Sequence, residues 1–168
     1  MEENLEQVKQ AMMAYFGADQ RRISHALRVT GFAEVLLCKE PGVRDVVMAA
    51  ALLHDIGIRE AERKFGSSAG NLQEQEGPPV AREMLLSLGF SLPVIDEVCQ
   101  IIASHHSPGE VDTDNFRIIW DADWLVNLGD EFSLTDQEKT RELIQRIFLT
   151  ETGRSLAQRE YLPCGATV

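Results

Sequence analysis

Apolar residues recur along the chain at intervals of three or four positions, the spacing of one face of an α-helix. No segment keeps the alternation of apolar and polar residues that a half-buried strand requires. The pattern therefore predicts an all-α fold, a bundle of six or seven helices. The helices predicted from this spacing span residues 5–16, 19–36, 46–53, 79–88, 93–105, 116–128 and 135–148.

Turn and cap signals refine this prediction. Asp19 is expected to be the N-cap of the second helix, and "TDQE" places Thr135 and Glu138 at capping-box spacing before the last one. Residues 61–77, "AERKFGSSAGNLQEQEG", are polar and contain Gly and Ser. We expect them to form a long loop that serves as a lid or a wall of a site.

Length and charge limit the classes of function. A chain of 168 residues with 44% hydrophobic composition is expected to form one domain with a sizeable core. Its net charge of −11 disfavours a surface for polymeric nucleic acid, because phosphate backbones are bound by clustered Lys and Arg. The charge does not exclude a single nucleotide in a local pocket.

Cysteine usage and the N-terminus predict a cytoplasmic protein without membrane association. Cys38, Cys99 and Cys164 are odd in number and far apart, which fits neither a disulfide framework nor a zinc knuckle. The chain has no run of about 18 apolar residues, and its first residues, "MEENLEQ", are acidic where a signal peptide is basic.

Ionisable residues interrupt the apolar stripes. In "ALLHDIGIRE" an apolar run ends in His54 and Asp55, while His25, His105 and Asp123 stand on the apolar stripes of their own predicted helices. One such histidine commonly has a structural role, satisfied by a backbone carbonyl. Several buried ionisable groups are costly unless they are paired or bind a metal, so the set together indicates one divalent-cation site.

The order of these residues resembles the HD-domain superfamily of metal-dependent phosphohydrolases. The resemblance rests on His25, then His54 and Asp55 in "LLHDIG", then Asp123 in "DADWL", and covers about residues 19–130 of the chain. Residues 131–168 form a C-terminal helix and tail beyond it. The resemblance implies an HD-like helical fold in which these four side chains bind a divalent metal.

Weaker parts of the resemblance add further site residues. "IIASHH" and "EQEGPPVA" imply that His105, His106 and Glu76 are ligands of a second metal or contacts to phosphate. Asp55 would bridge two metals, and His105 or His106 could instead act as a general acid. On this interpretation Asp55, His105 and His106 are the catalytic residues.

The sequence also departs from its relatives. Ile58 stands where several relatives have a lysine or a glutamate. Arg59 or Lys64 would therefore have to supply the positive charge that binds phosphate. The alternative is that each of them forms an exposed ion pair. Glu76 replaces the histidine of a branch that hydrolyses diadenosine polyphosphates, which disfavours that substrate. The Gly-Tyr-Pro motif of cyclic-di-GMP phosphodiesterases is absent after His106.

Mixed nitrogen and oxygen ligands suit Mn²⁺, Fe²⁺, Co²⁺ or Mg²⁺, as one ion or two, and a metal-bound water is a nucleophile near neutral pH. We therefore predict a metal-dependent phosphohydrolase that acts on a small phosphomonoester, a nucleotide or a cyclic nucleotide. Two alternatives stay open: a di-iron oxygenase of the HD type and a non-catalytic ligand-sensing module. The sequence does not indicate an oligomeric state.

Helical phase separates two neighbouring aspartates. Asp121 and Asp123 are two residues apart, or about 200° around a helix, so both cannot point into one site. Asp123 is in phase with the apolar stripe and is assigned to the metal. Asp121 is expected to form a surface ion pair or to orient a metal ligand.

Overall fold

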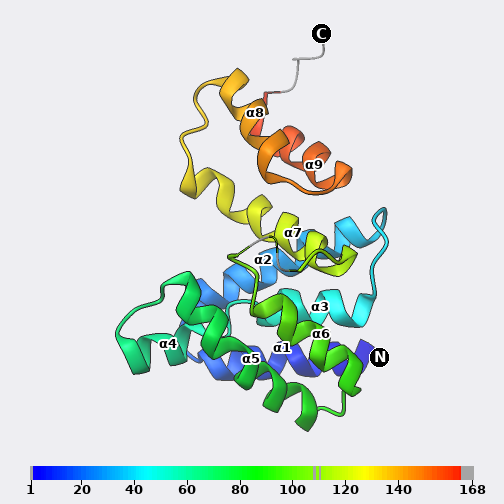
Figure 1. The fold of residues 1–168 in the computed structure, drawn as a ribbon, viewed down its shortest axis with the longest axis vertical. Helices are drawn as coiled ribbons and strands as arrows, with labels where there is room; N and C mark the ends of the chain where they lie inside the picture. The colour runs from blue at the N-terminus through cyan, green and yellow to red at the C-terminus, as the bar shows by residue number, and fades with distance from the viewer. Residues whose placement is uncertain (1, 108, 110, 164–168) are drawn as a thin grey trace.

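A computed structural model of the chain describes residues 2–107, 109 and 111–163, and in this part it is all-α, as predicted. The labelled helices outnumber the predicted six or seven (Figure 1). They are α1 (Glu2–Phe16), α2 (Gln20–Leu37), α3 (Arg44–Leu53), α4 (Ile58–Phe65), α5 (Gly70–Ser87), α6 (Leu92–Ile102), α7 (Asp114–Glu131), α8 (Gln137–Ile147) and α9 (Glu151–Tyr161).

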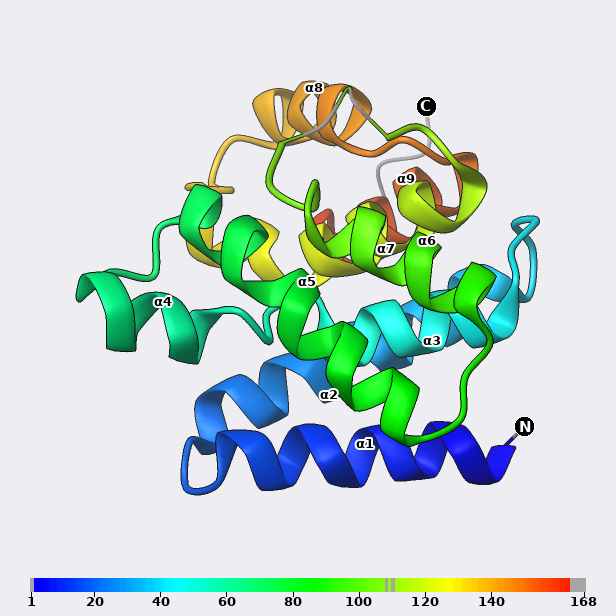
Figure 2. The same cartoon turned by 60° about the horizontal axis from the view of Figure 1, so that its bottom comes forward.

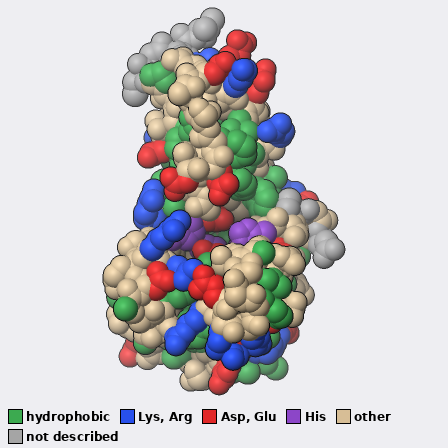
Figure 3. Space-filling view, turned by 90° about the vertical axis from the view of Figure 1, so that its left-hand side faces the viewer, with side chains coloured by type: hydrophobic (Ala, Val, Ile, Leu, Met, Phe, Trp, Pro, Cys, Tyr) green, Lys and Arg blue, Asp and Glu red, His purple; other side chains and the backbone are tan. Residues whose placement is uncertain are grey.

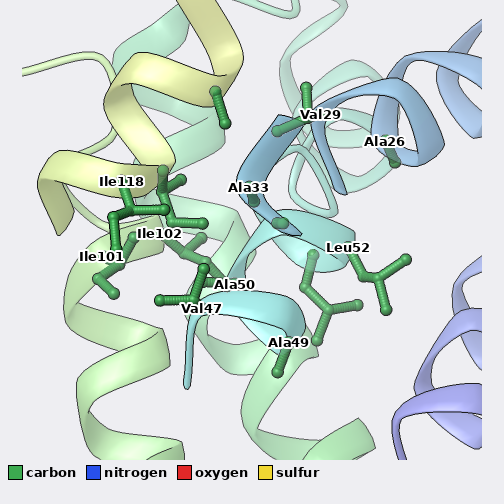
Figure 4. Close-up of a cluster of buried hydrophobic side chains, with 14 of the residues drawn as sticks. Ala26, Val29, Ala33, Val47, Ala49, Ala50, Leu52, Ile101, Ile102 and Ile118 are labelled. Atoms are coloured by element: carbon green, nitrogen blue, oxygen red, sulfur yellow. The ribbon is translucent and has the colours of Figure 1, made fainter. Parts of the chain in front are cut away.

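The core is built around α3. Every residue of this helix from Val46 to Leu53 is buried, because α1, α2, α6 and α7 pack around it. Figure 2 shows α3 enclosed between these helices, and Figure 4 shows its side chains meeting those of α2, α6 and α7. A helix that is apolar on all sides is stable only when it is surrounded in this way.

The predicted N-cap of the second helix is confirmed, but the predicted end of the helix over 93–105 is wrong. The Asp19 side chain accepts a hydrogen bond from the Arg22 backbone N–H and caps α2. The structure ends α6 at Ile102, three residues before the predicted end, so that His105 and His106 lie in the turn that follows.

The predicted loop over residues 61–77 is wrong. Most of this segment belongs to α4 and α5, and only residues 66–69 between them are not helical. The polar residues here are mostly Glu, Gln, Arg and Lys, which are good helix formers, and α4 still buries Ile58 and Ala61. The helix predicted to start at Pro79 instead begins at Gly70 and continues through Pro78 and Pro79.

The C-terminal region differs from the prediction in two further ways. The N-cap of α8 is Asp136, not Thr135, because the Asp136 carboxylate accepts the backbone N–H groups of Glu138 and Lys139. Helix α9 was not predicted. It buries only Gly153 and Ala157, so the sequence has no stripe of large apolar residues there.

Asp121 is a buried structural residue rather than a surface one. Its side chain has no exposed area, and its two oxygens accept hydrogen bonds from Leu149 N at 2.8 Å, Thr150 N at 2.9 Å and Thr150 Oγ1 at 2.6 Å. A Cβ at Gly153 would stand 2.1 Å from Asp121 Oδ2, so this close approach requires glycine. Asp121 thus holds the start of α9 against α7, at the end of the molecule that α8 and α9 form (Figure 1).

The structure describes two of the three cysteines. Cys38 is exposed, Cys99 is buried, and both are free thiols, whereas Cys164 lies outside the described residues. In the part of the chain that the structure covers, no helix combines the length and the apolar character needed to cross a bilayer.

Replacing Asp121 should destabilise the fold. We expect Asp121→Asn to lower the free energy of unfolding by about 2 kcal/mol or more, because an amide NH₂ would face donors that now bond to a carboxylate. The control is Asp112→Asn, which removes an exposed ion pair with Arg117 and should change the stability much less. Urea denaturation of the three proteins measures this, and equal losses would contradict the role given to Asp121.

Candidate metal centre

The turns at two helix ends present three of the four histidines. His54 and Asp55 occupy the turn between α3 and α4, and His105 and His106 occupy the turn after α6. The first turn lies directly on α5, because a Cβ at Gly57 would stand 2.4 Å from the Gln73 carbonyl oxygen. This close contact fixes the direction in which the His54 and Asp55 side chains leave the backbone.

Four side chains from α2, α7 and the turn after α3 converge on one point. His25 Nε2 lies 3.1 Å from His54 Nε2 and 3.1 Å from Asp123 Oδ1. Asp55 Oδ2 lies 3.5 Å from both of these ring nitrogens, and Asp123 Oδ1 lies 3.6 Å from His54 Nε2. The structure therefore brings together the four residues singled out in the sequence.

Backbone carbonyls set the orientation of two rings. His54 Nδ1 donates to the Ala51 carbonyl oxygen at 2.9 Å, and His105 Nδ1 donates to that of Ile102 at 2.7 Å. Both acceptors stand three residues earlier, in the last turn of a helix, where carbonyls lack helical N–H partners. In each neutral ring the Nε2 lone pair then faces the cluster, which is the orientation that a metal ligand needs.

A second group shares Asp55 with the first. Asp55, His105 and His106 present ligand atoms close enough for one ion, with His105 Nε2 3.5 Å from Asp55 Oδ1. Among the described residues His105 Nε2 has no hydrogen-bond partner although it is buried. His106 Nε2 donates to Gln73 Oε1 at 3.2 Å, which leaves its Nδ1 free to accept.

This donor set fits divalent metals. Buried polar atoms without partners are rare, and a cation beside His105 would satisfy the orphaned nitrogen. The first group, His25, His54 and Asp55, could hold one ion, and the second could hold another with Asp55 between them. Imidazole and carboxylate ligands in this mixture suit first-row transition metals or Mg²⁺.

Burial and neighbouring charges act in opposite directions on the ionisable groups of the cluster. Although burial opposes a charge on His54, the carboxylates of Asp55 and Asp123 raise its pKa to about 9. Burial likewise opposes ionisation of Asp55 and Asp123, but the neighbouring histidines hold the pKa of each below its usual range. Burial and the adjacent His105 lower the pKa of His106, which is therefore neutral near pH 7.

The cluster opens into a cavity of about 590 Å³. His25, Asp55, His106 and Asp123 are part of its wall, and Figure 3 shows the histidines in a hollow across the middle of the molecule. Three arginines of α2 line this cavity: Arg21, Arg22 and Arg28. The chain has a net charge of −11, so these arginines form a positively charged region on an acidic protein.

Three assignments made from the sequence are not borne out by the geometry. Arg59 lies over the Tyr15 ring, 5.2 Å from its centroid, and donates to the Tyr15 carbonyl oxygen, so it faces α1. Lys64 pairs with the buried carboxylate of Glu76. Neither cation lines the cavity beside the cluster. Glu76, which pairs with Lys64, belongs to neither potential metal group of the described residues.

Sequence reasoning missed the cations and amides that the structure places at this cavity. Arg21 and Arg28 stand four residues before and three residues after His25, so helical spacing from that histidine could have found them. Asn127, four residues after Asp123, could have been found in the same way, whereas Gln73 carried no such signal. Gln73 accepts from His106, and Asn127 donates to Asp123 Oδ1 at 2.8 Å.

Comparison with known proteins agrees with the resemblance seen in the sequence. The family model described as HD domain matches residues 22–128, from the start of α2 to the end of α7. A solved structure described as a predicted HD superfamily hydrolase, from an uncultured Thermotogales bacterium, is similar with 30% sequence identity and a TM-score of 0.61. The alignment covers 96% of this chain and 84% of that one. No curated protein matches the chain.

The raised pKa of His54 gives the metal-free protein a predictable pH dependence. The folded value of about 9 exceeds the ordinary 6.5, so this group stabilises the fold fully below pH 6.5 and the contribution is lost as the pH rises through 9. In the presence of a chelator, Tm should fall by on the order of 5 °C between pH 6.5 and 9.5. The control is His54→Gln, which lacks the titrating ring and should show a flatter profile; parallel profiles would contradict this origin.

Proposed function

Since this chain belongs to the HD domain family, we propose that it is a metal-dependent hydrolase of a small phosphate ester. The observation that carries the proposal is the convergence of His25, His54, Asp55 and Asp123, with ligand atoms 3.1 to 3.6 Å apart, at the wall of a cavity with a cationic side. The similar structure described as a predicted hydrolase supports the reaction class.

Two groups of ligands favour a site for two ions. His25, His54 and Asp123 would hold one ion, His105 and His106 the other, and Asp55 directs one carboxylate oxygen toward each group. When bound, a divalent metal polarises a phosphoryl oxygen and lowers the pKa of a coordinated water. The protein's own contribution is to orient the rings of His54 and His105 through the Ala51 and Ile102 carbonyl oxygens, so that Nε2 of each ring faces the site.

Arg21 and Arg28 are the residues we assign to the phosphate. Both are exposed on the stripe of α2 that carries His25, and neither forms an ion pair with a described residue. Arg22, in contrast, is held by Asp19 and Glu62. Unpaired guanidinium groups beside a phosphoryl site bind non-bridging oxygens and stabilise the charge that develops in phosphoryl transfer.

An assay without oxygen distinguishes the proposed phosphohydrolase from an oxygenase. We expect the metal-loaded protein to release inorganic phosphate from a simple ester such as p-nitrophenyl phosphate under strictly anaerobic conditions. Metal analysis after purification without chelator should accompany the assay. Oxygen uptake coupled to substrate loss would favour an oxygenase, and bound metal without any turnover would favour a ligand-sensing module.

Removal of one ligand charge should weaken both metal retention and turnover. We expect Asp123→Asn to lower metal content and to reduce kcat/KM on the order of 100-fold or more, because a neutral amide binds the metal weakly. The matched control is Asp114→Asn, which removes an exposed carboxylate from the first turn of the same helix. Full metal content and rate in Asp123→Asn would refute the ligand assignment.

Loss of either unpaired arginine should weaken substrate binding. We expect Arg21→Ala and Arg28→Ala each to raise KM by about 10-fold, the effect of one charge-assisted hydrogen bond, with metal content unchanged. Arg82→Ala is the control, because Arg82 is exposed on α5 and pairs with Asp96. Steady-state kinetics at constant ionic strength measure the change, and KM values equal to that of the control would exclude phosphate binding by these residues.

A further inference from the structure

His106 differs from two other histidines of the site in how its ring is held. His54 and His105 are buried, and in each ring Nδ1 donates to a backbone carbonyl three residues earlier. His106 is exposed, and within the described residues no backbone carbonyl holds its ring. An exposed ring that can change rotamer loses conformational freedom when it binds a ligand. The affinity of His106 for an ion therefore depends on the contacts that fix the ring beforehand.

The start of α5 supplies these contacts. The Glu74 carboxylate accepts the His106 backbone N–H at 2.9 Å through Oε1 and the Ser107 hydroxyl at 3.0 Å through Oε2. Gln73 Oε1 accepts from His106 Nε2 at 3.2 Å. Gly70 leaves room for the ring, because a Cβ there would stand 2.9 Å from His106 Cγ. One short segment of α5 thus fixes both the backbone of this turn and the imidazole ring.

The Gln73 side chain also decides which nitrogen of His106 carries the proton. Gln73 Nε2 donates to the Ser68 backbone carbonyl oxygen at 2.7 Å, and a carbonyl oxygen can only accept. The amide NH₂ group must therefore face Ser68, and the amide oxygen must face His106. An oxygen acceptor at that position requires the proton of a neutral ring on Nε2. The lone pair of His106 then lies on Nδ1.

The ring held in this way belongs to the second ligand group. The ring centroids of His105 and His106 are 4.0 Å apart, and the two rings and Asp55 offer ligand atoms within 4.8 Å of one another. Of these three residues only His106 is exposed. His106 is therefore the member of the group that depends most on contacts from outside the cluster.

We propose that Gln73 and Glu74 are positioning residues for a second metal ion, because they hold His106 so that Nδ1 is the nitrogen offered to an ion beside Asp55. The proposal rests on the two-ion site of the function proposed above. Gln73 sets the position of the proton on the ring, and Glu74 sets the backbone of the turn. The contribution of α5 to the site thus comes from these two residues and not from Glu76, the ligand predicted from the sequence.

Calorimetric titration with Mn²⁺ alone, on the full chain after removal of metal with a chelator, tests the proposal. We expect the unaltered protein to bind two ions. Gln73→Leu and Glu74→Ala should each weaken binding of the second ion by about 10-fold or more, the usual effect of removing a group that orients a metal ligand. The first ion should keep its affinity within about twofold, which also shows that the variants are folded.

Two further variants separate positioning from a general effect of charge or folding. Glu74→Gln keeps an oxygen that can accept one of the two hydrogen bonds, so it should retain more of the affinity for the second ion than Glu74→Ala. Glu83→Ala is the matched control, because it removes an exposed carboxylate from the same helix. It should leave the binding of both ions unchanged, and a loss equal to that of Glu74→Ala would overturn the proposal.

Failure of the proposed function would look different, because the titration does not depend on hydrolysis. Two ions in the unaltered protein, with selective weakening of the second in Gln73→Leu and Glu74→Ala, support the positioning role even if no ester is hydrolysed. A single ion in the unaltered protein overturns it. Equal weakening of both ions, or unchanged binding of the second ion in these variants, overturns it as well, whatever the outcome of the turnover assay.

Discussion

The constraint on which the structure depends is the burial of ionisable groups that cannot satisfy one another. His54 is 1% exposed at the end of the most enclosed helix, and its Nε2 faces another imidazole nitrogen and two carboxylates. Two neutral imidazole nitrogens that both present lone pairs cannot form a hydrogen bond, whereas a proton or a metal ion between them would satisfy both. Although burial opposes a charge on His54, the carboxylates of Asp55 and Asp123 favour a proton there and raise its pKa to about 9.

The packing of α3 explains how this constraint is met. An apolar helix with Ala49, Ala50 and Ala51 at its centre lets α2, α6 and α7 approach closely, and each of these neighbours carries site residues on or just beyond it. His25 comes from α2, Asp123 from α7, and the His105–His106 pair from the turn after α6. The site is thus a consequence of core packing, because the same contacts that bury α3 bring the ligands together.

Helical phase correctly placed the candidate ligands of α2 and α7 on the inner side of their helices, because it depends only on local periodicity. His25 and Asp123 lie on the inner stripes of their helices, and the all-α class follows from the same spacing. Features set by tertiary partners were not predictable. Lys64 and Arg59 point to Glu76 and Tyr15, and Asp121 is buried only because the start of α9 covers it. The polar composition of residues 61–77 suggested a loop, although Glu, Gln, Arg and Lys favour an exposed helix surface equally well.

The arginines and the tryptophans around the cluster come from two different helices. Helix α2 supplies His25 together with the unpaired Arg21 and Arg28, and α7 supplies Asp123 together with Trp120 and Trp124. Because α2 and α7 pack directly on each other, the distance between the arginines and the tryptophans is fixed by one helix interface. Substitutions within one turn of His25 or Asp123 can therefore change what the site accepts while leaving the ligand atoms in place. On the proposed function, this arrangement would separate the metal ligands, which carry the chemistry, from specificity, which would depend on exposed or half-buried neighbours on the same two helices.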